Sequence, residues 1–371
     1  MNIILLGATG SIGSMCLDLI SDNNYSLLGV SLGRDLDKSK KIVSKFKPKY
    51  ICVRKEDDKA IFDGLCDNIF VGDKGLEELA KIKSDLVVNA LSGSAGLIPT
   101  VSAINAKNDI ALANKESLVM AGDIIMKLAK KNNVNIYPID SEHSAIWQAI
   151  KGEDVKNINR IYITASGGAF RDKKREELEN VTIVDALKHP NWSMGKKITI
   201  DCATMMNKGL EIIEAHHLFN MPYSKITPIL HKESKVHALV EFSDSSVKAI
   251  LSNPDMKEPI LYALNKGNRG VYDNKFKLST LHFKKVQFKR FPLVKCAIDA
   301  GKKGGIMPTV LTSSNEAAVN LFLDGKIKFL DIEKIVIKEL ENTTNFKPTL
   351  EDIIRVDKEV RERILGGRLW Q

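Results

Sequence analysis

The chain has 371 residues, of which 44% are hydrophobic and 27% charged, and its formal net charge is +9. This length allows two or three domains with a large core, and no apolar run approaches the roughly twenty residues that a membrane-spanning helix needs. The positive charge is spread along the chain and aromatic residues make up only 6%, which argues against nucleic-acid binding and favours small anionic ligands.

The first expected element is a buried strand at residues 2–6. It runs into the motif Gly-Ala-Thr-Gly-Ser-Ile-Gly at residues 7–13, called here the fingerprint turn, and then into an amphipathic helix through about Ile20. Such glycines let backbone N–H groups approach a pyrophosphate, and the helix N-terminus adds partial positive charge. With a second strand at residues 26–32, the pattern predicts dinucleotide binding rather than a tight turn alone.

The N-terminus and the cysteines indicate the compartment. A strand that begins at the second residue leaves no room for a targeting segment, so we expect a cytoplasmic location. The five cysteines are scattered without a C-x-x-C pair, which predicts neither a disulfide framework nor a zinc site.

The second strand ends at Gly33, Arg34 and Asp35, where this type of fold contacts the adenosine ribose. Arg34 can pair with the 2′-phosphate of NADP, whereas Asp35 would repel that phosphate or bind the 2′-hydroxyl of NAD. The two residues thus argue in opposite directions, and of the two cofactors we favour NADP. The alternative is a solvated surface pair with no cofactor role.

Further parallel strands are expected at residues 50–53, 85–90 and 110–113, each followed by a polar or glycine-rich loop. Because ligands bind at such loops, residues 92–96 and 113–117 are candidates for cofactor and substrate contacts. Lys115 is equally well explained as an ordinary lysine at a helix start.

Three carboxylates predict a metal site. Asp140 and Glu142 follow an expected strand at residues 135–139, and residues two apart on an extended segment point the same way, so both can bind one cation. Glu211 would complete the site from a helix expected over residues 203–219, on which Asn207 and Lys208 lie on neighbouring faces. The alternative is that Asp140 or Ser141 is an ordinary helix N-cap.

A second domain is expected to hold the substrate. After a strand at residues 158–165, the Ser-Gly-Gly sequence at residues 166–168, called here the anion nest, suits a phosphate. The loop at residues 188–195 contains Pro, Gly and Trp192 and looks like a lid that excludes water, although Trp192 is also explained as a core residue under a loop.

The remaining signals are structural. His216 and His217 are interpreted as residues favoured by the dipole at a helix end, not as ligands. Amphipathic patterns at the C-terminal end predict a small helical bundle, at residues 297–300, 312–323, 332–341 and 350–364.

The motifs at residues 7–13, 113–117, 140–143, 166–168, 189–195 and 203–211, taken in this order, resemble those of the 1-deoxy-D-xylulose 5-phosphate reductoisomerase family over nearly the whole chain. The resemblance implies an α/β fold with a Rossmann-type NADP-binding domain at residues 1–139, an α/β catalytic domain with a lid loop at 140–265, a linker at 266–291 and a helical bundle at 292–371. It implies NADPH-dependent conversion of 1-deoxy-D-xylulose 5-phosphate to 2-C-methyl-D-erythritol 4-phosphate in the non-mevalonate isoprenoid pathway, by a homodimer that binds neither membrane nor nucleic acid.

The resemblance also implies a role for individual residues. Mg²⁺ or Mn²⁺ would bind to Asp140, Glu142 and Glu211, with Lys115 and His189 as further catalytic residues. The sugar phosphate would contact Lys115, Ser141, Glu142, Ser166, His189, Trp192, Cys202, Asn207, Lys208 and Glu211. NADPH would contact Thr9, Gly10, Ser11, Ile12, Gly33, Arg34, Asp35, Asn114, Lys115, Glu116, Met194 and Gly195.

The chain departs from the family pattern at three positions. Cys202 replaces a serine that contacts the substrate phosphate, Asp35 replaces an asparagine, and Ala169 replaces a proline beside the anion nest.

Two other functions fit parts of the sequence. One is a different Rossmann dehydrogenase acting on a phosphorylated or amino-acid semialdehyde, which would need no metal triad. The other is a non-catalytic dinucleotide sensor, which would tolerate loss of Lys208 and Glu211.

Overall fold

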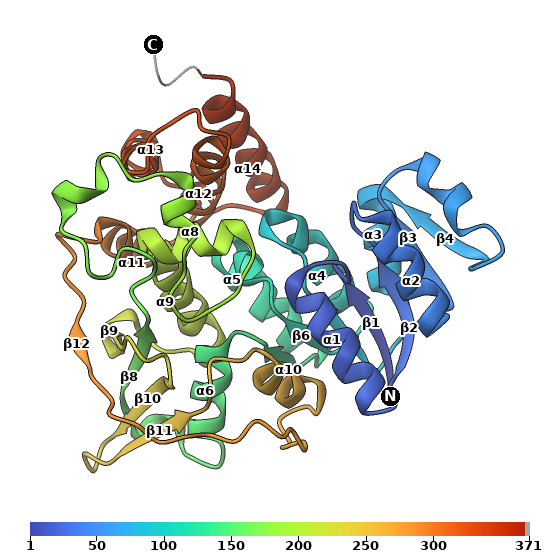
Figure 1. The fold of residues 1–371 in the computed structure, drawn as a ribbon, viewed down its shortest axis with the longest axis horizontal. Coiled ribbons are helices and arrows are strands. Elements are labelled where there is room, and N and C mark those ends of the chain that lie inside the picture. Colours follow the sequence, from blue (N-terminus) through green and yellow to red (C-terminus); the bar gives the residue numbers. More distant parts are fainter. Residues whose placement is uncertain (368–371) are drawn as a thin grey trace. The chain divides into compact units, whose positions relative to one another are not determined.

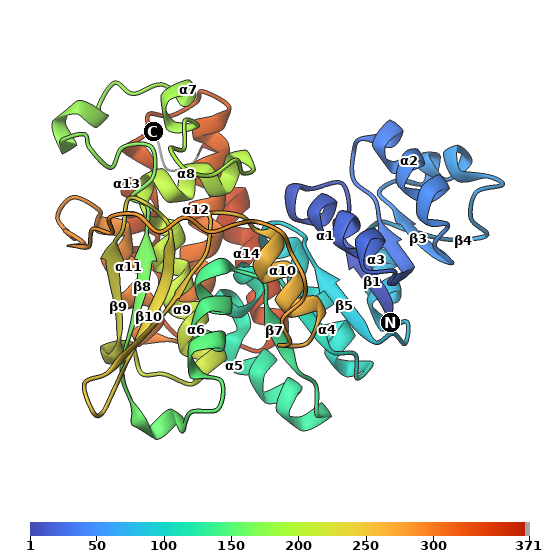
Figure 2. The same ribbon diagram turned by 60° about the horizontal axis from the view of Figure 1, so that its bottom comes forward.

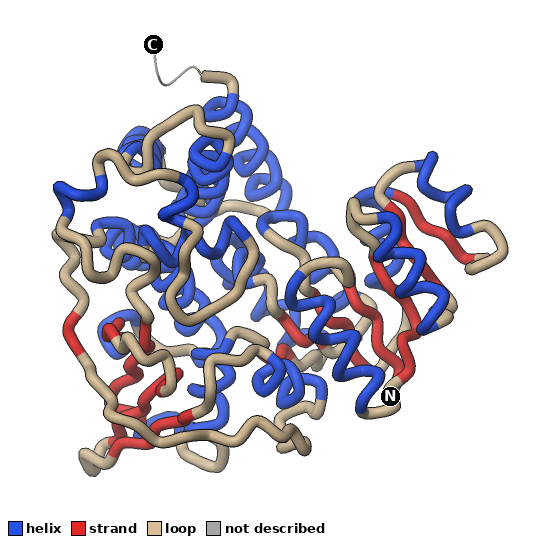
Figure 3. The backbone as a smooth tube through the Cα atoms, viewed as in Figure 1, coloured by secondary structure: helices blue, strands red, loops and turns tan. Residues whose placement is uncertain are grey.

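The computed structural model describes residues 1–367, and the chain folds into two compact units. The first unit contains residues 1–117, 123–144 and 256–273, and the second contains residues 118–122, 145–255 and the chain from Asn274 onward. Figures 1 and 3 show the labelled elements and their helical or extended conformation. The expected boundaries at residues 139, 265 and 291 stay a prediction, and the last four residues of the expected helical domain lie outside the described range.

The first unit is built on a seven-stranded sheet with the order β4-β3-β2-β1-β5-β6-β7. All neighbouring strands are parallel. The strands are β1 (Asn2–Leu6), β2 (Ser26–Ser31), β3 (Tyr50–Val53), β4 (Asn68–Val71), β5 (Leu86–Asn89), β6 (Ile110–Leu112) and β7 (Ile136–Pro138). The strand order reverses at β1, which is where an open α/β sheet forms its ligand crevice. The expected Rossmann-type fold is confirmed, although β4 was not predicted.

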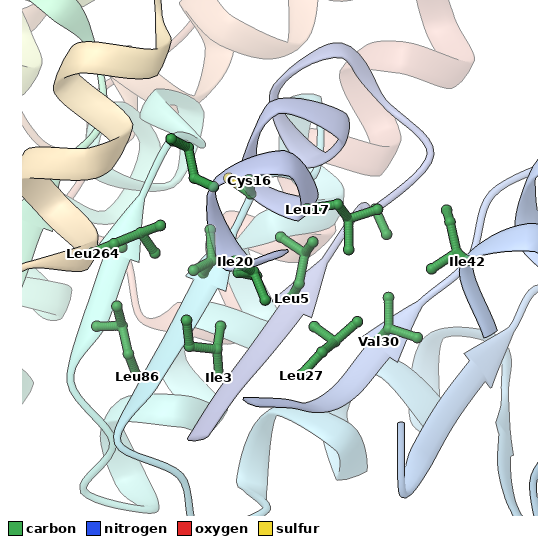
Figure 4. Packing of buried hydrophobic residues seen from close by; sticks show 14 of the residues in the cluster. Ile3, Leu5, Cys16, Leu17, Ile20, Leu27, Val30, Ile42, Leu86 and Leu264 are labelled. Atoms are coloured by element: carbon green, nitrogen blue, oxygen red, sulfur yellow. The ribbon is translucent and has the colours of Figure 1, made fainter. Parts of the chain in front are cut away.

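Helices cover both faces of this sheet. They are α1 (Ser11–Asp22), α2 (Leu36–Phe46), α3 (Gly72–Lys81), α4 (Leu97–Asn105), α10 (Lys257–Leu264) and the ends of α5 (Lys115–Asn132) and α6 (Ser141–Ile150) that belong to this unit. Successive strand residues point to opposite faces. Ile3 and Leu5 therefore face Cys16 and Ile20 of α1, and Leu264 of α10 joins the same buried cluster (Figure 4).

The second unit contains a five-stranded mixed sheet with the order β11-β10-β8-β9-β12. Its strands are β8 (Ile158–Ala165), β9 (Ile226–Leu230), β10 (Val236–Phe242), β11 (Val247–Leu251) and β12 (Lys284–Lys285). β8 and β9 are parallel because helices connect them, and the other neighbours are antiparallel. The prediction of β8 is confirmed, whereas the other four strands were not predicted.

The helices of the second unit form a connection between β8 and β9 and a C-terminal bundle (Figure 2). They are α7 (Ile183–Ala186), α8 (Lys196–Thr204), α9 (Met206–Phe219), α11 (Pro292–Lys303), α12 (Met307–Leu323), α13 (Asp331–Asn342) and α14 (Leu350–Leu365). α12 packs against α11, α13 and α14 and is buried along most of its length. The expected C-terminal bundle is therefore confirmed.

One detail corrects the sequence analysis. The single helix expected over residues 203–219 is two helices, because Met205 adopts the left-handed conformation with φ of 63° and ends α8. Residues 256–264 contribute Ile260 and Leu261 to the core of the first unit. Within residues 1–367, none of the helices is both long and apolar enough to cross a membrane.

Candidate active site

The fingerprint turn follows β1 and leaves no room for side chains at two of its glycines. Gly7 has φ of +88°, and a Cβ atom there would lie 2.6 Å from the carbonyl oxygen of Ala90. A Cβ atom on Gly13 would lie 2.1 Å from the carbonyl oxygen of Gly7. Gly10 is the N-cap residue of α1 and no side chain caps the helix. The first N–H groups of α1 can therefore donate to an anion, as a pyrophosphate site requires.

The end of β2 packs against this turn. A Cβ atom on Gly33 would lie 2.1 Å from the Thr9 hydroxyl oxygen, and Lys38 Nζ donates to the Thr9 carbonyl oxygen at 2.8 Å. Arg34 and Asp35 are exposed. The Asp35 carboxylate accepts a hydrogen bond of 2.9 Å from the Lys38 backbone N–H and so caps α2. Asp35 thus has a structural role that the sequence analysis did not assign.

Asn114 ties together the loops after β5 and β6. Its side-chain nitrogen donates to the carbonyl oxygens of Leu91 (2.9 Å) and Gly93 (2.7 Å). Its side-chain oxygen accepts from the backbone N–H of Ser117 at 3.1 Å, which caps α5. Asn114 is buried, so it fixes the neighbouring Lys115 and Glu116 on a rigid edge of the sheet.

Lys115 and Asp140 form an ion pair in the first unit. Lys115 Nζ lies 2.6 Å from Asp140 Oδ2, and both side chains are about nine-tenths buried. The second oxygen of Asp140 accepts from the Glu142 backbone N–H at 3.2 Å and lies 2.9 Å from Nδ1 of the fully buried His143. Asp140 therefore lies directly before α6 and accepts from a backbone N–H of its first turn, as the N-cap alternative predicts. It also forms part of a cluster of charged groups.

Ser141 and Glu142 start α6. The Ser141 hydroxyl donates to a Glu142 carboxylate oxygen at 2.5 Å. Ser141 and Glu142 are only partly buried, unlike His143. A carboxylate at this position is accessible to a ligand.

In the second unit, Asn207, Lys208 and Glu211 meet on the first turns of α9. Lys208 Nζ forms an ion pair with one Glu211 oxygen, and Asn207 Nδ2 donates to the other at 2.5 Å. Glu211 is 1% exposed and Lys208 3%. Burying such charges is costly unless they are paired, and the pairing here matches the spacing predicted from the sequence.

The anion nest lies against the end of α8. Gly167 and Gly168 have φ of +84° and +68°. A Cβ atom on Gly168 would lie 2.3 Å from the carbonyl oxygen of Cys202, so a side chain at this position is excluded. Ser166 Oγ accepts from the Gly168 backbone N–H at 3.2 Å and lies 2.9 Å from His189 Nε2. Burial and the positive charge of Arg171 lower the pKa of His189 to about 4.

The 188–195 loop is held by its own residues and by two more distant segments. Nδ1 of His189 accepts from the backbone N–H groups of Asn191 (3.2 Å) and Trp192 (3.0 Å). The Trp192 ring makes an edge contact with the ring of His237, with centroids 6.1 Å apart. Met194 is partly buried, and Gly195 caps the start of α8.

Sequence reasoning missed several residues that shape this region. Arg171 contacts Asn191, and Asn191 contacts Lys232 and Ser234, about forty residues further along the chain. His143, buried beside Asp140, was also missed, although its spacing of three residues on a helix was visible in the sequence. No local pattern marks the other contacts.

The donors present fit the expected cofactors. Asp140, Glu142 and Glu211 offer carboxylate oxygens only, which are the ligands that Mg²⁺ and Mn²⁺ prefer. The uncapped α1 N-terminus and the close-packed glycines suit a dinucleotide pyrophosphate. The fold and the fingerprint turn together define a dinucleotide-binding α/β protein with a second α/β unit.

The chain belongs to the 1-deoxy-D-xylulose 5-phosphate reductoisomerase family. A family model of that description matches residues 3–122, a model of its C-terminal domain matches residues 136–219, and a model of the DXP reductoisomerase C-terminal domain matches residues 251–363.

Individual relatives are similar to this chain over nearly its full length. 1-Deoxy-D-xylulose 5-phosphate reductoisomerase of Bacillus subtilis (strain 168) is 53% identical to it, and the match covers 97% of each chain. The protein of the same name from Macrococcus caseolyticus (strain JCSC5402) is 49% identical and covers 98% of each. A crystal structure of DOX-P reductoisomerase in complex with NADPH, fosmidomycin and magnesium has a TM-score of 0.93, with 39% identity over 99% of this chain and 98% of that one. The Zymomonas mobilis enzyme in complex with NADPH has a TM-score of 0.90, with 37% identity over 98% of both chains.

Proposed function

We propose that this protein converts 1-deoxy-D-xylulose 5-phosphate and NADPH to 2-C-methyl-D-erythritol 4-phosphate and NADP⁺, with Mg²⁺ or Mn²⁺, in the non-mevalonate isoprenoid pathway. The observation that carries the proposal is the buried group on α9, where Glu211 is paired with Lys208 and Asn207. The relatives of this chain are named 1-deoxy-D-xylulose 5-phosphate reductoisomerase. A dinucleotide sensor would have no need to bury two charges in this way.

The metal ligands in this proposal are Asp140, Glu142 and Glu211. When bound, the divalent ion supplies Lewis-acid stabilisation of the negative charge that develops on the sugar oxygens. Lys115 holds Asp140 through their ion pair of 2.6 Å, and its ammonium group is suited to contact a sugar oxygen. Lys208 and Asn207 hold Glu211, and an ammonium and an amide are both N–H donors of the kind that suits a phosphate.

The remaining assignments divide between substrate and cofactor. Ser166 and Cys202 are proposed to contact the phosphate and Ser141 the sugar, with His189 and Trp192 covering it. The cofactor contacts are proposed to come from the fingerprint turn, from Gly33, Arg34 and Asp35, from Asn114 to Glu116, and from Met194 and Gly195. Support comes from the uncapped helix α1, which suits the pyrophosphate, and from the exposed guanidinium of Arg34, which suits a 2′-phosphate.

The deciding experiment is an assay of NADPH oxidation with 1-deoxy-D-xylulose 5-phosphate, with and without EDTA. We expect turnover that EDTA removes and added Mg²⁺ or Mn²⁺ restores. Absence of turnover in the presence of the metal would reject the proposed reaction, and turnover that resists EDTA would reject the metal ligands.

We further propose a homodimer in the cytoplasm, as expected from the family resemblance. Light scattering coupled to gel filtration measures the mass. A mass equal to one chain at micromolar concentration would contradict the dimer.

A further inference from the structure

Arg171 and Asn191 connect the 188–195 loop to a segment far away in the sequence. Arg171 Nη1 donates to Asn191 Oδ1 at 3.1 Å and to the carbonyl oxygen of Lys232 at 2.9 Å. Asn191 Nδ2 donates to the same carbonyl oxygen at 2.7 Å and to Ser234 Oγ at 2.9 Å. Three of these four hydrogen bonds involve Asn191 and hold both ends of its amide, and the fourth ties the charged Arg171 to the same carbonyl oxygen.

The position of Asn191 determines which nitrogen of His189 carries a proton. Nδ1 of His189 accepts from the backbone N–H groups of Asn191 and Trp192, so it cannot itself be protonated. A neutral imidazole then has its proton on Nε2. Because Nε2 lies 2.9 Å from Ser166 Oγ, His189 donates to the serine. The lowered pKa of His189 agrees, since burial and Arg171 both disfavour the imidazolium.

Ser166 is thereby oriented as a donor. Its oxygen accepts from His189 Nε2 and from the Gly168 backbone N–H. With both lone pairs used, the hydroxyl proton is the group left to contact a third partner. A hydroxyl fixed as a donor suits an anion such as a phosphate, and it does not suit a cation.

The anion nest also makes room for Arg171. A Cβ atom on Gly167 would lie 2.7 Å from Cβ of Arg171. The side chain of Arg171 is 22% exposed, so it is packed in place and not freely rotating. One short segment therefore supplies both the nest and the residue that holds the loop.

We propose that Arg171 is a positioning residue that holds the 188–195 loop in place through Asn191, an arrangement called here the latch. The latch fixes His189 as a hydrogen-bond donor to Ser166, and thereby fixes Ser166 as a donor to the phosphate of the substrate. The inference deepens the proposed function and rests on it for the identity of the anion. Arg171 itself does not touch the reacting atoms in this scheme.

Kinetics with 1-deoxy-D-xylulose 5-phosphate provide the first test. Arg171→Ala is expected to raise KM for the sugar phosphate about tenfold, with kcat changed by less than about threefold, because a weakened phosphate contact affects ground-state and transition-state binding alike. Arg171→Lys, which keeps the charge but not the planar guanidinium whose Nη1 makes both hydrogen bonds, should recover only part of the loss. Arg160→Ala, at an exposed position on β8, is the matched control and should leave KM unchanged.

The second test reads the His189 proton directly by NMR of protein labelled with ¹⁵N-histidine. The signals of His189 are identified by their loss in His189→Gln. We expect a protonated Nε2 and an unprotonated Nδ1 at pH 7 in the wild type, and a mixture of tautomers in Arg171→Ala. A protonated Nδ1 in the wild type, or an unchanged tautomer and an unchanged KM in Arg171→Ala, would overturn the latch.

Failures of folding and of the proposed function remain distinguishable. If Arg171→Ala does not fold, Ser234→Ala removes one acceptor of Asn191 and should raise KM about threefold, and no rise would reject the latch. If the wild type does not turn over the sugar phosphate, the proposed reaction fails. The NMR comparison then still decides whether Arg171 sets the tautomer of His189.

Discussion

The fingerprint turn of the first unit and the α9 region of the second are built from different parts of the chain. The turn uses backbone groups: Gly7 and Gly13 approach neighbouring carbonyl oxygens too closely for any side chain, and no side chain caps α1. The α9 region uses side chains: Lys208 and Glu211 are buried and depend on each other. The first region should therefore be sensitive to added atoms, and the second to altered charge.

The largest effect is expected at Glu211. Glu211→Gln keeps the shape but removes the charge that we assign to the metal and that pairs with Lys208, so turnover should fall by about a hundredfold or more. NADPH binding, measured by fluorescence, should stay nearly intact because the fingerprint turn is unchanged. Glu359→Gln, at an exposed ion pair on α14, is the control. Activity above about a tenth of wild type would contradict the metal assignment.

Gly13 tests the backbone half of the comparison. Gly13→Ala would place a Cβ atom 2.1 Å from the Gly7 carbonyl oxygen, a backbone atom that cannot rotate away. We expect NADPH to bind at least about tenfold more weakly and stability to fall by about 1–3 kcal/mol. Gly33→Ala meets only the side chain of Thr9, whose hydroxyl is the nearest atom and can rotate away, and should cost less. Equal effects of the two variants on the Kd of NADPH would show that rotation of Thr9 gives no relief.

Cys202 tests whether the side-chain region can be improved. A thiol is a weaker hydrogen-bond donor than a hydroxyl, so Cys202→Ser should lower KM for the sugar phosphate roughly two- to tenfold, or about 0.5–1.5 kcal/mol, with little change in kcat. Protection of the thiol from alkylation by bound substrate is the accompanying measurement. An unchanged KM without protection would mean that Cys202 only packs at the end of α8.

A substitution of Asp35 tests whether this residue affects cofactor choice in addition to capping α2. NADPH should be preferred to NADH through Arg34, and Asp35 should narrow that preference. Asp35→Asn keeps an N-cap side chain for α2 and removes the charge, so the ratio of kcat/KM for NADPH over NADH should rise about threefold. A wild type that prefers NADH would contradict the cofactor assignment.

The smallest effect concerns acid stability. The pKa of His189 is lowered to about 4 from the usual 6.5 of an unfolded chain, so the unfolded state takes up the proton first as the pH falls. The free energy of unfolding should therefore decrease between about pH 6.5 and pH 4. Urea titrations at pH 7 and pH 5 measure this decrease in the free energy of unfolding, which should be smaller in His189→Gln than in the wild type. An equal decrease in both proteins would mean that His189 is not buried as a neutral group.

Local patterns predicted most of the strands of the first unit. The strand, glycine-rich turn and helix at residues 2–22, and the parallel strands after them, follow from hydrophobic runs and glycine positions only a few residues apart. β4, with a partly exposed four-residue run, gave too short a signal. The pairing of Glu211 with Asn207 and Lys208 was also predictable, because one helical turn fixes the spacing.

Tertiary structure decided the rest. The break at Met205 depends on a left-handed residue that no glycine or proline marks, and β9 to β12 acquire their positions only by pairing with distant strands. The contacts of Arg171 and Asn191 with Lys232 join residues 61 and 41 positions apart. Sequence alone therefore determined most strands of the first unit, the C-terminal helices, the family motifs and the candidate residues, since these depend on neighbours along the chain. The hydrogen-bond partners of His189 and Ser166 were decided by the fold, since Ser166 and His189 lie 23 positions apart along the chain.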